Sequence, residues 1–298
     1  MRQMKGTNTS NRFKWNKSSL IETDLYIKLY IAALNQFLSP QDKQSLFMIS
    51  KFFTDGAAEV GRNRFLLAEY YFKQGEIYYG NAGDNSLLKQ VITNVYDRSK
   101  SFYYHRTGNS EKAIELINNT LLNNKLLEEK GFKFLVFDRI QQYLNLARVY
   151  FSLGDTQKAF ELLIGITCFL IQGKTNLLPD LNENFLTEYD EELRKTKFSL
   201  LCQILFETTG HLQKIKDKEQ FFSESIQYFS GVIEAANGYV IFLPEDKLLK
   251  KWILTLSYFY SEKYKKFNTK AKDYLKNEPP FYNGLPHRSL EIFLNLIP

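Results

Sequence analysis

The sequence predicts an all-α protein built from stacked antiparallel helical hairpins. Apolar residues recur at helical spacing along most of the 298 residues, whereas alternating strand patterns occur only near 132–137 and 239–243. The chain has 7 prolines and 15 glycines, which is little turn material for an all-β protein. We therefore expect about ten or eleven helices joined by short connections, in a single helical-repeat domain over 18–298.

The first helices are delimited by capping and breaking residues. Ser19 and Glu22 fit a capping box, and apolar residues at helical spacing follow as far as about Leu38. Ser39-Pro40 then ends one helix and begins the next, with the serine as N-cap. Asp55-Gly56 predicts a break, so this stretch is expected to form three helices, at about 20–38, 40–54 and 58–79.

The remaining elements follow a turn at 80–85. Two hairpins are the clearest, over 84–127 and 134–172, and a loop is expected at 173–183. The rest of the chain, 184–298, predicts less regular hairpins with helices at about 184–209, 217–236, 245–275 and 286–296.

The two clear hairpins share an internal repeat. Tyr104, Gly108, Ala113 and Ile117 are spaced four, five and four residues apart, and the later set Tyr150, Gly154, Ala159 and Leu163 has the same spacing. The glycine supplies a left-handed residue where the chain folds back, and the Asn or Asp that follows it can cap the next helix. The alanine is small where the two helices touch.

These residues resemble the tetratricopeptide repeat (TPR) family. Tyr143, Leu146, Ala147 and Tyr150 match its first-helix pattern, and Gly154, Ala159 and Leu163 match its turn and second helix. The copy at 94–127 departs from it, since Asp97 and Lys100 stand where an aromatic residue and Leu are usual. The copies are also 46 residues apart, counted from Ala113 to Ala159, rather than the 34 of the standard repeat.

The resemblance implies a TPR-like α-solenoid whose first helices line a concave, peptide-binding groove. Arg is suited to two-point binding of a carboxylate, Asn and Gln to a peptide backbone, and Phe to an apolar anchor. The alternative is that the phenylalanines belong to the core and the arginines to a solvated face. The candidate groove residues are Arg98, Phe102, His105 and Arg106 in one copy and Gln141, Asn145, Arg148 and Phe151 in the other.

Sequence motifs of catalysis and metal binding are absent. The three histidines, His105, His211 and His287, are scattered, and no HExxH, CxxC, Walker A or GxSxG motif occurs. Cys168 and Cys202 lie in apolar helical stretches and are expected to be buried free thiols. We expect a non-enzymatic protein with no cofactor and no metal.

Charge is concentrated at the two ends of the chain, whose net charge is +6. Residues 1–17 hold five Lys and Arg with no acidic residue and are expected to form a basic flexible arm. Residues 246–276 hold nine lysines against three acidic residues, interleaved with aromatic side chains. This segment predicts either an amphipathic helix with its aromatics in the core or a surface for nucleic acid or an acidic membrane.

The expected function is a scaffold or adaptor that binds a protein or peptide, with an acidic group in the partner. The alternative is a regulatory protein that binds nucleic acid or a signalling peptide. No run reaches the ~18 apolar residues of a membrane span, no leader pattern is seen at the start, and the usage of cysteine suits the cytoplasm. The apolar end 289–298 predicts either homo-oligomer formation through terminal helices or a cap on the helix stack.

Overall fold

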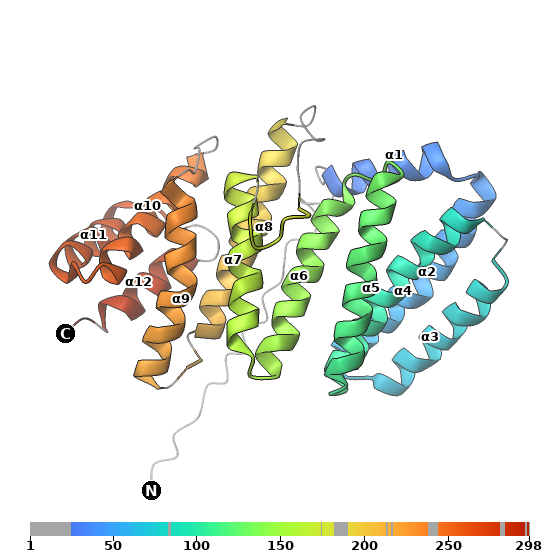
Figure 1. Cartoon of the computed structure of the whole chain (residues 1–298), viewed down its shortest axis with the longest axis horizontal. Coiled ribbons are helices and arrows are strands. Elements are labelled where there is room, and N and C mark those ends of the chain that lie inside the picture. Colours follow the sequence, from blue (N-terminus) through green and yellow to red (C-terminus); the bar gives the residue numbers. More distant parts are fainter. Residues whose placement is uncertain are drawn as a thin grey trace, which may run out of the picture.

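The computed structural model describes residues 25–82, 85–173, 175–181, 190–212, 214–215, 217–237, 244–280, 284–295 and 297. These residues form twelve helices and no strand, so the predicted all-α fold is confirmed (Figure 1). The basic arm predicted for 1–17 lies outside the described residues. The helices are α1 (Leu25–Phe37), α2 (Pro40–Gly61), α3 (Phe65–Gly80), α4 (Ser86–Arg106), α5 (Ser110–Glu129), α6 (Leu135–Ser152), α7 (Thr156–Gln172), α8 (Asp190–Leu212), α9 (Lys218–Asn237), α10 (Pro244–Tyr260), α11 (Tyr264–Asn277) and α12 (Leu285–Leu294).

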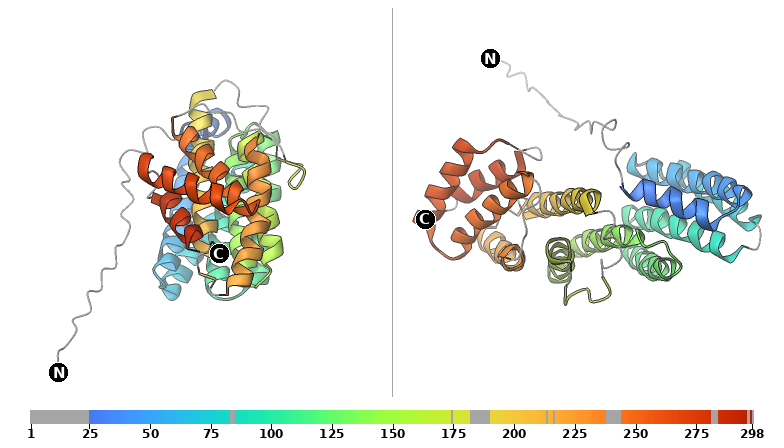
Figure 2. Two further views of the ribbon diagram at one scale, coloured as in Figure 1. Left: turned by 90° about the vertical axis from the view of Figure 1, so that its left-hand side faces the viewer. Right: turned by 90° about the horizontal axis from the view of Figure 1, so that it is seen from above.

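Helices that follow each other in the chain pack in pairs along the molecule. The pairs α2–α3, α4–α5 and α6–α7 each form a hairpin, and α2 also lies along α4. The second half is less regular than a series of hairpins, because α9 packs more extensively against α7 and α10 than against α8. Seen from above, the helices follow one another from the blue end to the red end of an elongated molecule (Figure 2, right).

The two predicted reversals at glycine are confirmed. Gly108 has φ 85° and Gly154 has φ 77°, both in the left-handed region that favours glycine. The backbone amide of Lys112 donates to Asn109 Oδ1 at 3.1 Å, and that of Lys158 donates to Asp155 Oδ1 at 3.2 Å. Each glycine therefore ends one helix, and the next residue caps the helix that folds back.

The predicted break at Asp55-Gly56 is wrong, because α2 continues to Gly61. Gly56 is instead a packing position: an added Cβ there would lie 2.9 Å from the ring of Phe72 on α3. Gly75 of α3 is the counterpart, since its Cβ would lie 2.3 Å from the ring of Phe53 on α2. Two reciprocal glycine–phenylalanine contacts thus bring α2 and α3 close together.

The prediction of a single helix over 245–275 is also wrong. The chain reverses after α10, and Glu262 adopts φ 57°, a left-handed conformation without glycine. The amide of Lys263 closes the turn by donating to the Tyr258 carbonyl at 2.9 Å. The resulting hairpin buries Trp252, Phe267 and Tyr274, each with no exposed surface. These aromatic side chains therefore belong to the core, which was the first of the two interpretations of this segment.

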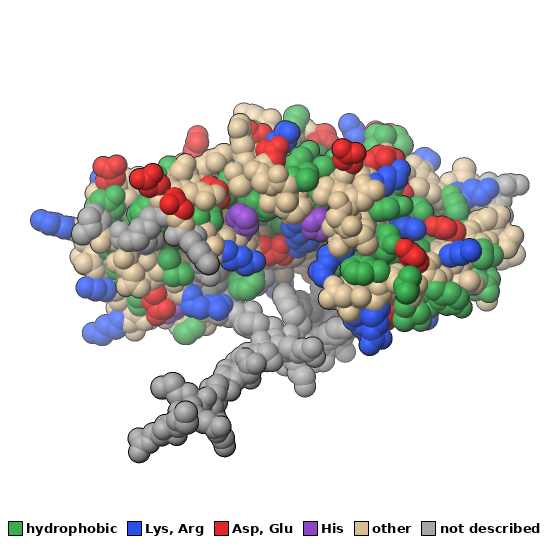
Figure 3. All heavy atoms as spheres, turned by 90° about the horizontal axis from the view of Figure 1, so that it is seen from below, with side chains coloured by type: hydrophobic (Ala, Val, Ile, Leu, Met, Phe, Trp, Pro, Cys, Tyr) green, Lys and Arg blue, Asp and Glu red, His purple; other side chains and the backbone are tan. Residues whose placement is uncertain are grey.

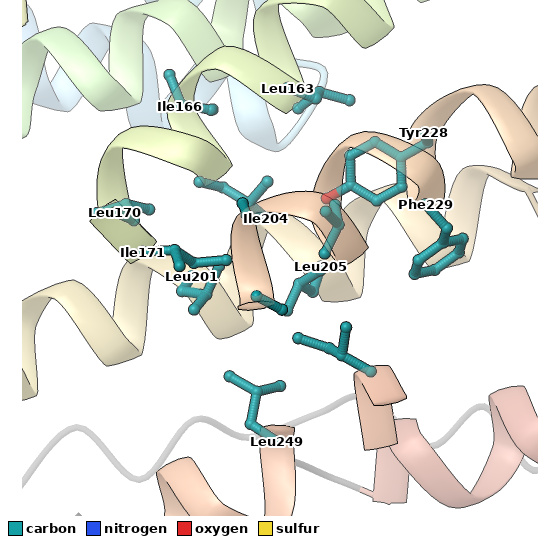
Figure 4. Close-up of a cluster of buried hydrophobic side chains, with 14 of the residues drawn as sticks. Leu163, Ile166, Leu170, Ile171, Leu201, Ile204, Leu205, Tyr228, Phe229 and Leu249 are labelled. Atoms are coloured by element: carbon teal, nitrogen blue, oxygen red, sulfur yellow. The ribbon is translucent and has the colours of Figure 1, made fainter. Parts of the chain in front are cut away.

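Two large hydrophobic cores occupy the two halves of the molecule. The first lies among α1, α2, α3, α4 and the start of α6, and includes Phe53 and Phe72. The second runs from α6 to α12; Figure 4 shows Leu163, Ile166 and Leu170 of α7 meeting side chains of α8, α9 and α10. A small third cluster, Ala113, Ile117, Leu146 and Val149, joins α5 to α6 between them.

The apolar C-terminal segment closes the second core. Leu290 and Phe293 of α12 are 0% and 2% exposed, and the Phe293 ring contacts the rings of Phe221, Phe229 and Phe259. The described part of this segment therefore caps the helix stack. In the part of the chain that the structure describes, every helix is too short or too polar to cross a membrane.

Candidate peptide-binding groove

Three cavities follow one another along α2, α4, α6 and α8. The largest, which we call the central groove, has a volume of about 760 Å³ and lies between α2, α4, α5 and α6. A cavity of about 230 Å³ beside α1 shares Thr54 and Arg98 with it, and a pocket of about 200 Å³ between α6 and α8 shares Arg148 with it. An arginine thus lies at each of the two boundaries between neighbouring cavities.

The central groove brings together six of the eight predicted site residues, from both repeat copies. Among the described residues that line it, three are arginines and none is Asp or Glu. On the face shown in Figure 3, histidine and charged side chains gather near the middle of the molecule. The lining residues are Thr54, Ala57, Ala58, Arg98, Ser99, Ser101, Phe102, His105, Arg106, Ile117, Asn145, Arg148 and Val149.

Arg98 is held by a buried carboxylate. Its Nη1 donates to Asp138 Oδ1 at 3.0 Å, and the Asp138 side chain is only 4% exposed. Asp138 also accepts from the amides of Asn124, at 2.8 Å, and Gln142, at 3.4 Å. The nearby Asp138 charge raises the pKa of the Arg98 guanidinium above its ordinary value. Arg98 therefore has a structural role in joining α4 to α6, besides its place on the groove wall.

Arg148 is bound by a carboxylate of the chain itself. Its Nε donates to Glu207 Oε2 at 2.8 Å and its Nη2 to Glu207 Oε1 at 2.6 Å, which links α6 to α8. The two side chains are 40% and 31% exposed. This is the two-point geometry expected for a carboxylate ligand, and it is made inside the protein.

Polar side chains of α6 connect the two arginines. Gln142, which donates to Asp138, accepts a hydrogen bond from Asn145 at 3.3 Å, and Asn145 in turn accepts from Arg148. Arg98 and Arg148 are therefore joined by one continuous hydrogen-bonded network, which fixes the directions of both guanidinium groups.

The other groove residues are more available to a ligand. Arg106 is exposed, and its Nη2 donates to the neutral side-chain oxygen of Asn63 at 2.6 Å. None of the hydrogen bonds of the described residues joins Arg106 to a carboxylate. Phe102 keeps 37% of its surface exposed. Burial, with help from Arg106 and Arg148, lowers the pKa of His105, whose Nδ1 is buried without a hydrogen-bond partner in the described part of the chain. These three side chains offer a charge, an apolar face and a neutral imidazole.

Phe151 and Gln141 lie outside the central groove, contrary to the prediction. Phe151 lines the small α6–α8 pocket, where its ring stacks on that of His211 with centroids 3.8 Å apart. Gln141 donates to Gln203 of α8 at 3.0 Å. Both side chains contact α8 instead. The repeat pattern does not predict that α8 lies next to α6.

The groove wall on α2 was missed by sequence reasoning. Thr54, Ala57 and Ala58 line it opposite α4. A signal was present, because Gly56-Ala57-Ala58 is a run of small residues inside a helix, which is typical of a close contact or a wall of a cavity. The pattern Asp55-Gly56 predicts a helix end at the first residue of this run, whereas α2 continues through it.

The lysine-rich C-terminal hairpin has a covered aromatic side and an exposed basic side. Phe259 and Phe267 are buried, while six lysines from Lys263 to Lys276 are exposed. Lys251 of α10 is neutralised by Asp273 at 3.2 Å and Glu278 at 2.6 Å. The aromatic rings named here are therefore not available as a stacking platform for bases.

Neither cysteine has the surroundings of a nucleophile. Both are free thiols, Cys202 buried and Cys168 half-buried, and burial raises both pKa values. Among the described residues, no three His, Cys, Asp or Glu side chains gather in a way that could hold a metal ion.

Comparisons of the chain with protein-family models, with curated proteins and with solved structures found no match.

Proposed function

We propose that this chain is a non-catalytic scaffold that binds an extended acidic segment of a partner protein along the row of cavities. The single observation that carries the proposal is the central groove of about 760 Å³, lined by three arginines and, among its described lining residues, by no Asp or Glu. Because Arg98 and Arg148 are paired with Asp138 and Glu207, the charge in this lining that favours an acidic occupant is mainly that of Arg106.

The side chains in the groove suit a peptide. Arg106, which has no carboxylate partner in the described part of the chain, offers its guanidinium to an Asp or Glu of the ligand, and Asn145 can bond a peptide backbone. Phe102 provides a flat apolar contact next to them. Because three cavities follow one another, an extended segment could place successive side chains in them, in the manner of a linear-motif complex.

The finer architecture that we propose is a TPR-like α-solenoid. The reversals at Gly108 and Gly154, and the fully buried Ala113 and Ala159 between paired helices, support this assignment. Two free thiols and no disulfide among the described cysteines support a reducing, cytoplasmic setting.

A displayed library of random peptides, selected on the immobilised full-length protein, tests the function. We expect the selected sequences to be enriched in Asp and Glu next to apolar residues. Arg106→Glu is expected to weaken binding of a selected peptide at least tenfold, because a charge-assisted hydrogen bond is replaced by a repulsion of more than about 1.4 kcal/mol.

Matched variants separate the groove from general charge effects. Lys125→Glu makes the same change of charge on an exposed residue of α5 and should leave binding unchanged. Phe102→Ala should weaken binding without altering the helical circular dichroism. Selection of basic peptides, or equal effects of Arg106→Glu and Lys125→Glu, would argue against the proposal.

The exposed lysines of the C-terminal hairpin support a second candidate, a regulatory protein that binds nucleic acid. Lys265, Lys266, Lys270, Lys272 and Lys276 all lie exposed on α11. Retention on duplex DNA and on RNA at low salt, with loss at high salt, would favour it, and each lysine replaced by Gln should lower the salt slope by about one unit. No retention at low salt would dismiss it.

A further inference from the structure

Helix α3 is apolar on both of its faces. Ala68 and Phe72 face α2 and are fully buried. Leu66, Tyr70 and Ile77 lie on the opposite side, within about 40° of one another at 100° per residue, and are 85%, 56% and 51% exposed. Leu67 and Tyr78, at 38% and 39%, lie beside them. We call Leu66, Tyr70 and Ile77 the α3 stripe.

The α3 stripe has no partner among the described helices. In that part of the chain α3 packs mainly on α2 and only slightly on α4, at the outer end of the molecule (Figure 1). Hydrophobic side chains are gathered at this end in Figure 3. A contiguous exposed apolar patch of this kind marks an interaction site.

We propose that the α3 stripe is a homodimer interface, in which α3 packs antiparallel against α3 of a second copy about a two-fold axis. Because the stripe extends from Leu66 to Ile77, its midpoint lies between residues 71 and 72. An antiparallel pair centred there places Leu66 of each copy opposite Ile77 of the other, so the apolar residues cover each other.

Charge on the flank of the stripe favours this arrangement. Lys73 and Glu69 lie on the same side of the stripe and both are exposed; Glu69 also accepts a hydrogen bond from the Tyr103 hydroxyl. A two-fold axis perpendicular to the helices brings like flanks together, and Lys73 is then level with Glu69 of the second copy to within about 2 Å along the helix. Two opposite-charge pairs result, whereas a two-fold parallel pair would put the two charged flanks on opposite sides of the interface and form neither pair.

Light scattering coupled to size exclusion, over a wide range of protein concentration, tests the proposal. We expect the full chain to have twice the 35.0 kDa mass of one copy at high concentration. Leu66→Glu and Ile77→Glu should each shift the protein to the monomer with unchanged circular dichroism, because both side chains are exposed in the single chain. Leu122→Glu, which replaces an equally apolar residue of α5 that is 61% exposed, is the matched control and should remain dimeric.

A charge exchange tests the antiparallel register. Lys73→Glu should raise the dimer dissociation constant about tenfold, since both symmetry-related pairs are lost, and adding Glu69→Lys should restore it. A monomeric wild-type chain at high concentration would overturn the proposal. So would a dimer that survives Leu66→Glu and Ile77→Glu, or one that the exchanged pair does not restore.

Discussion

Arg148 on α6 is joined to Glu207 on α8 by a two-point ion pair, with Nε–Oε2 2.8 Å and Nη2–Oε1 2.6 Å. Glu207 therefore occupies the place that an acidic group of the proposed partner would take on this arginine. Because the two side chains are 40% and 31% exposed, the pair contributes only about 0–1 kcal/mol to folding. The partner's carboxylate has to compete with Glu207.

Replacing Glu207 should strengthen peptide binding. We predict that Glu207→Gln lowers the dissociation constant of a selected acidic peptide, because it removes the competing charge and keeps the side-chain size. The free energy of unfolding should change by about 1 kcal/mol or less. Titration calorimetry and urea denaturation measure the two quantities, with Arg148→Gln as the control that should weaken binding. Weaker binding by Glu207→Gln would contradict the competition.

Removing Arg98 should destabilise the fold. Among the described residues, Arg98→Met leaves Asp138, which is 4% exposed, with only the amides of Asn124 and Gln142 as donors, and we expect a loss of about 3 kcal/mol in the free energy of unfolding. The double variant Arg98→Met/Asp138→Asn should recover most of it, because the uncompensated charge is gone. Urea denaturation at pH 7 checks this, and additive losses in the double variant would show that the two residues are not coupled.

Two glycines of α3 should respond in opposite ways to the same substitution. Gly75→Ala forces a methyl group against the Phe53 ring and should cost about 1–3 kcal/mol, despite the better helix propensity of alanine. Gly80→Ala meets nothing within 4 Å and should be neutral or stabilising by up to about 1 kcal/mol. Equal effects in thermal or urea unfolding would rule out the proposed packing role of Gly75.

Asp97 should make the protein less stable as the pH rises. The side chain is 7% exposed, and burial raises its pKa from 3.8 to about 6. The folded state therefore holds a proton that the unfolded state has lost, so stability falls between about pH 4 and pH 6 and the cost is complete above that range. Asp97→Asn should raise the free energy of unfolding by about 3 kcal/mol at pH 7 and have little effect at pH 3. The same gain at both pH values would exclude titration as the cause.

The fold was predictable where local chemistry decides it. Gly108-Asn109 and Gly154-Asp155 each combine a left-handed residue with a cap, and both reversals are present. Gly56 was misinterpreted because the sequence does not show that Phe72 lies across from it. The turn at Glu262 could not be predicted, because no local sequence pattern marks a glutamate that adopts a positive φ. The burial of Trp252 before the turn and of Phe267 after it determines that the chain reverses there.

The site was predictable to the extent that it lies on two repeated helices. Helical spacing alone brings Arg98, Phe102, His105 and Arg106 to one side of α4, and Asn145 and Arg148 to one side of α6. The carboxylates that bind the arginines could not be predicted in this way. Asp138 and Glu207 are 40 and 59 residues away from Arg98 and Arg148, so these pairs depend on how the helices pack.

Hydrogen–deuterium exchange of the full chain, with and without a selected acidic peptide, tests most directly whether the central groove is the binding site. The account predicts slower exchange at the groove-lining turns of α2, α4 and α6, around Ala57, Phe102 and Asn145, and no change on α11. Protection confined to α11 or to the outer face of α5, with α4 and α6 unaffected, would contradict it.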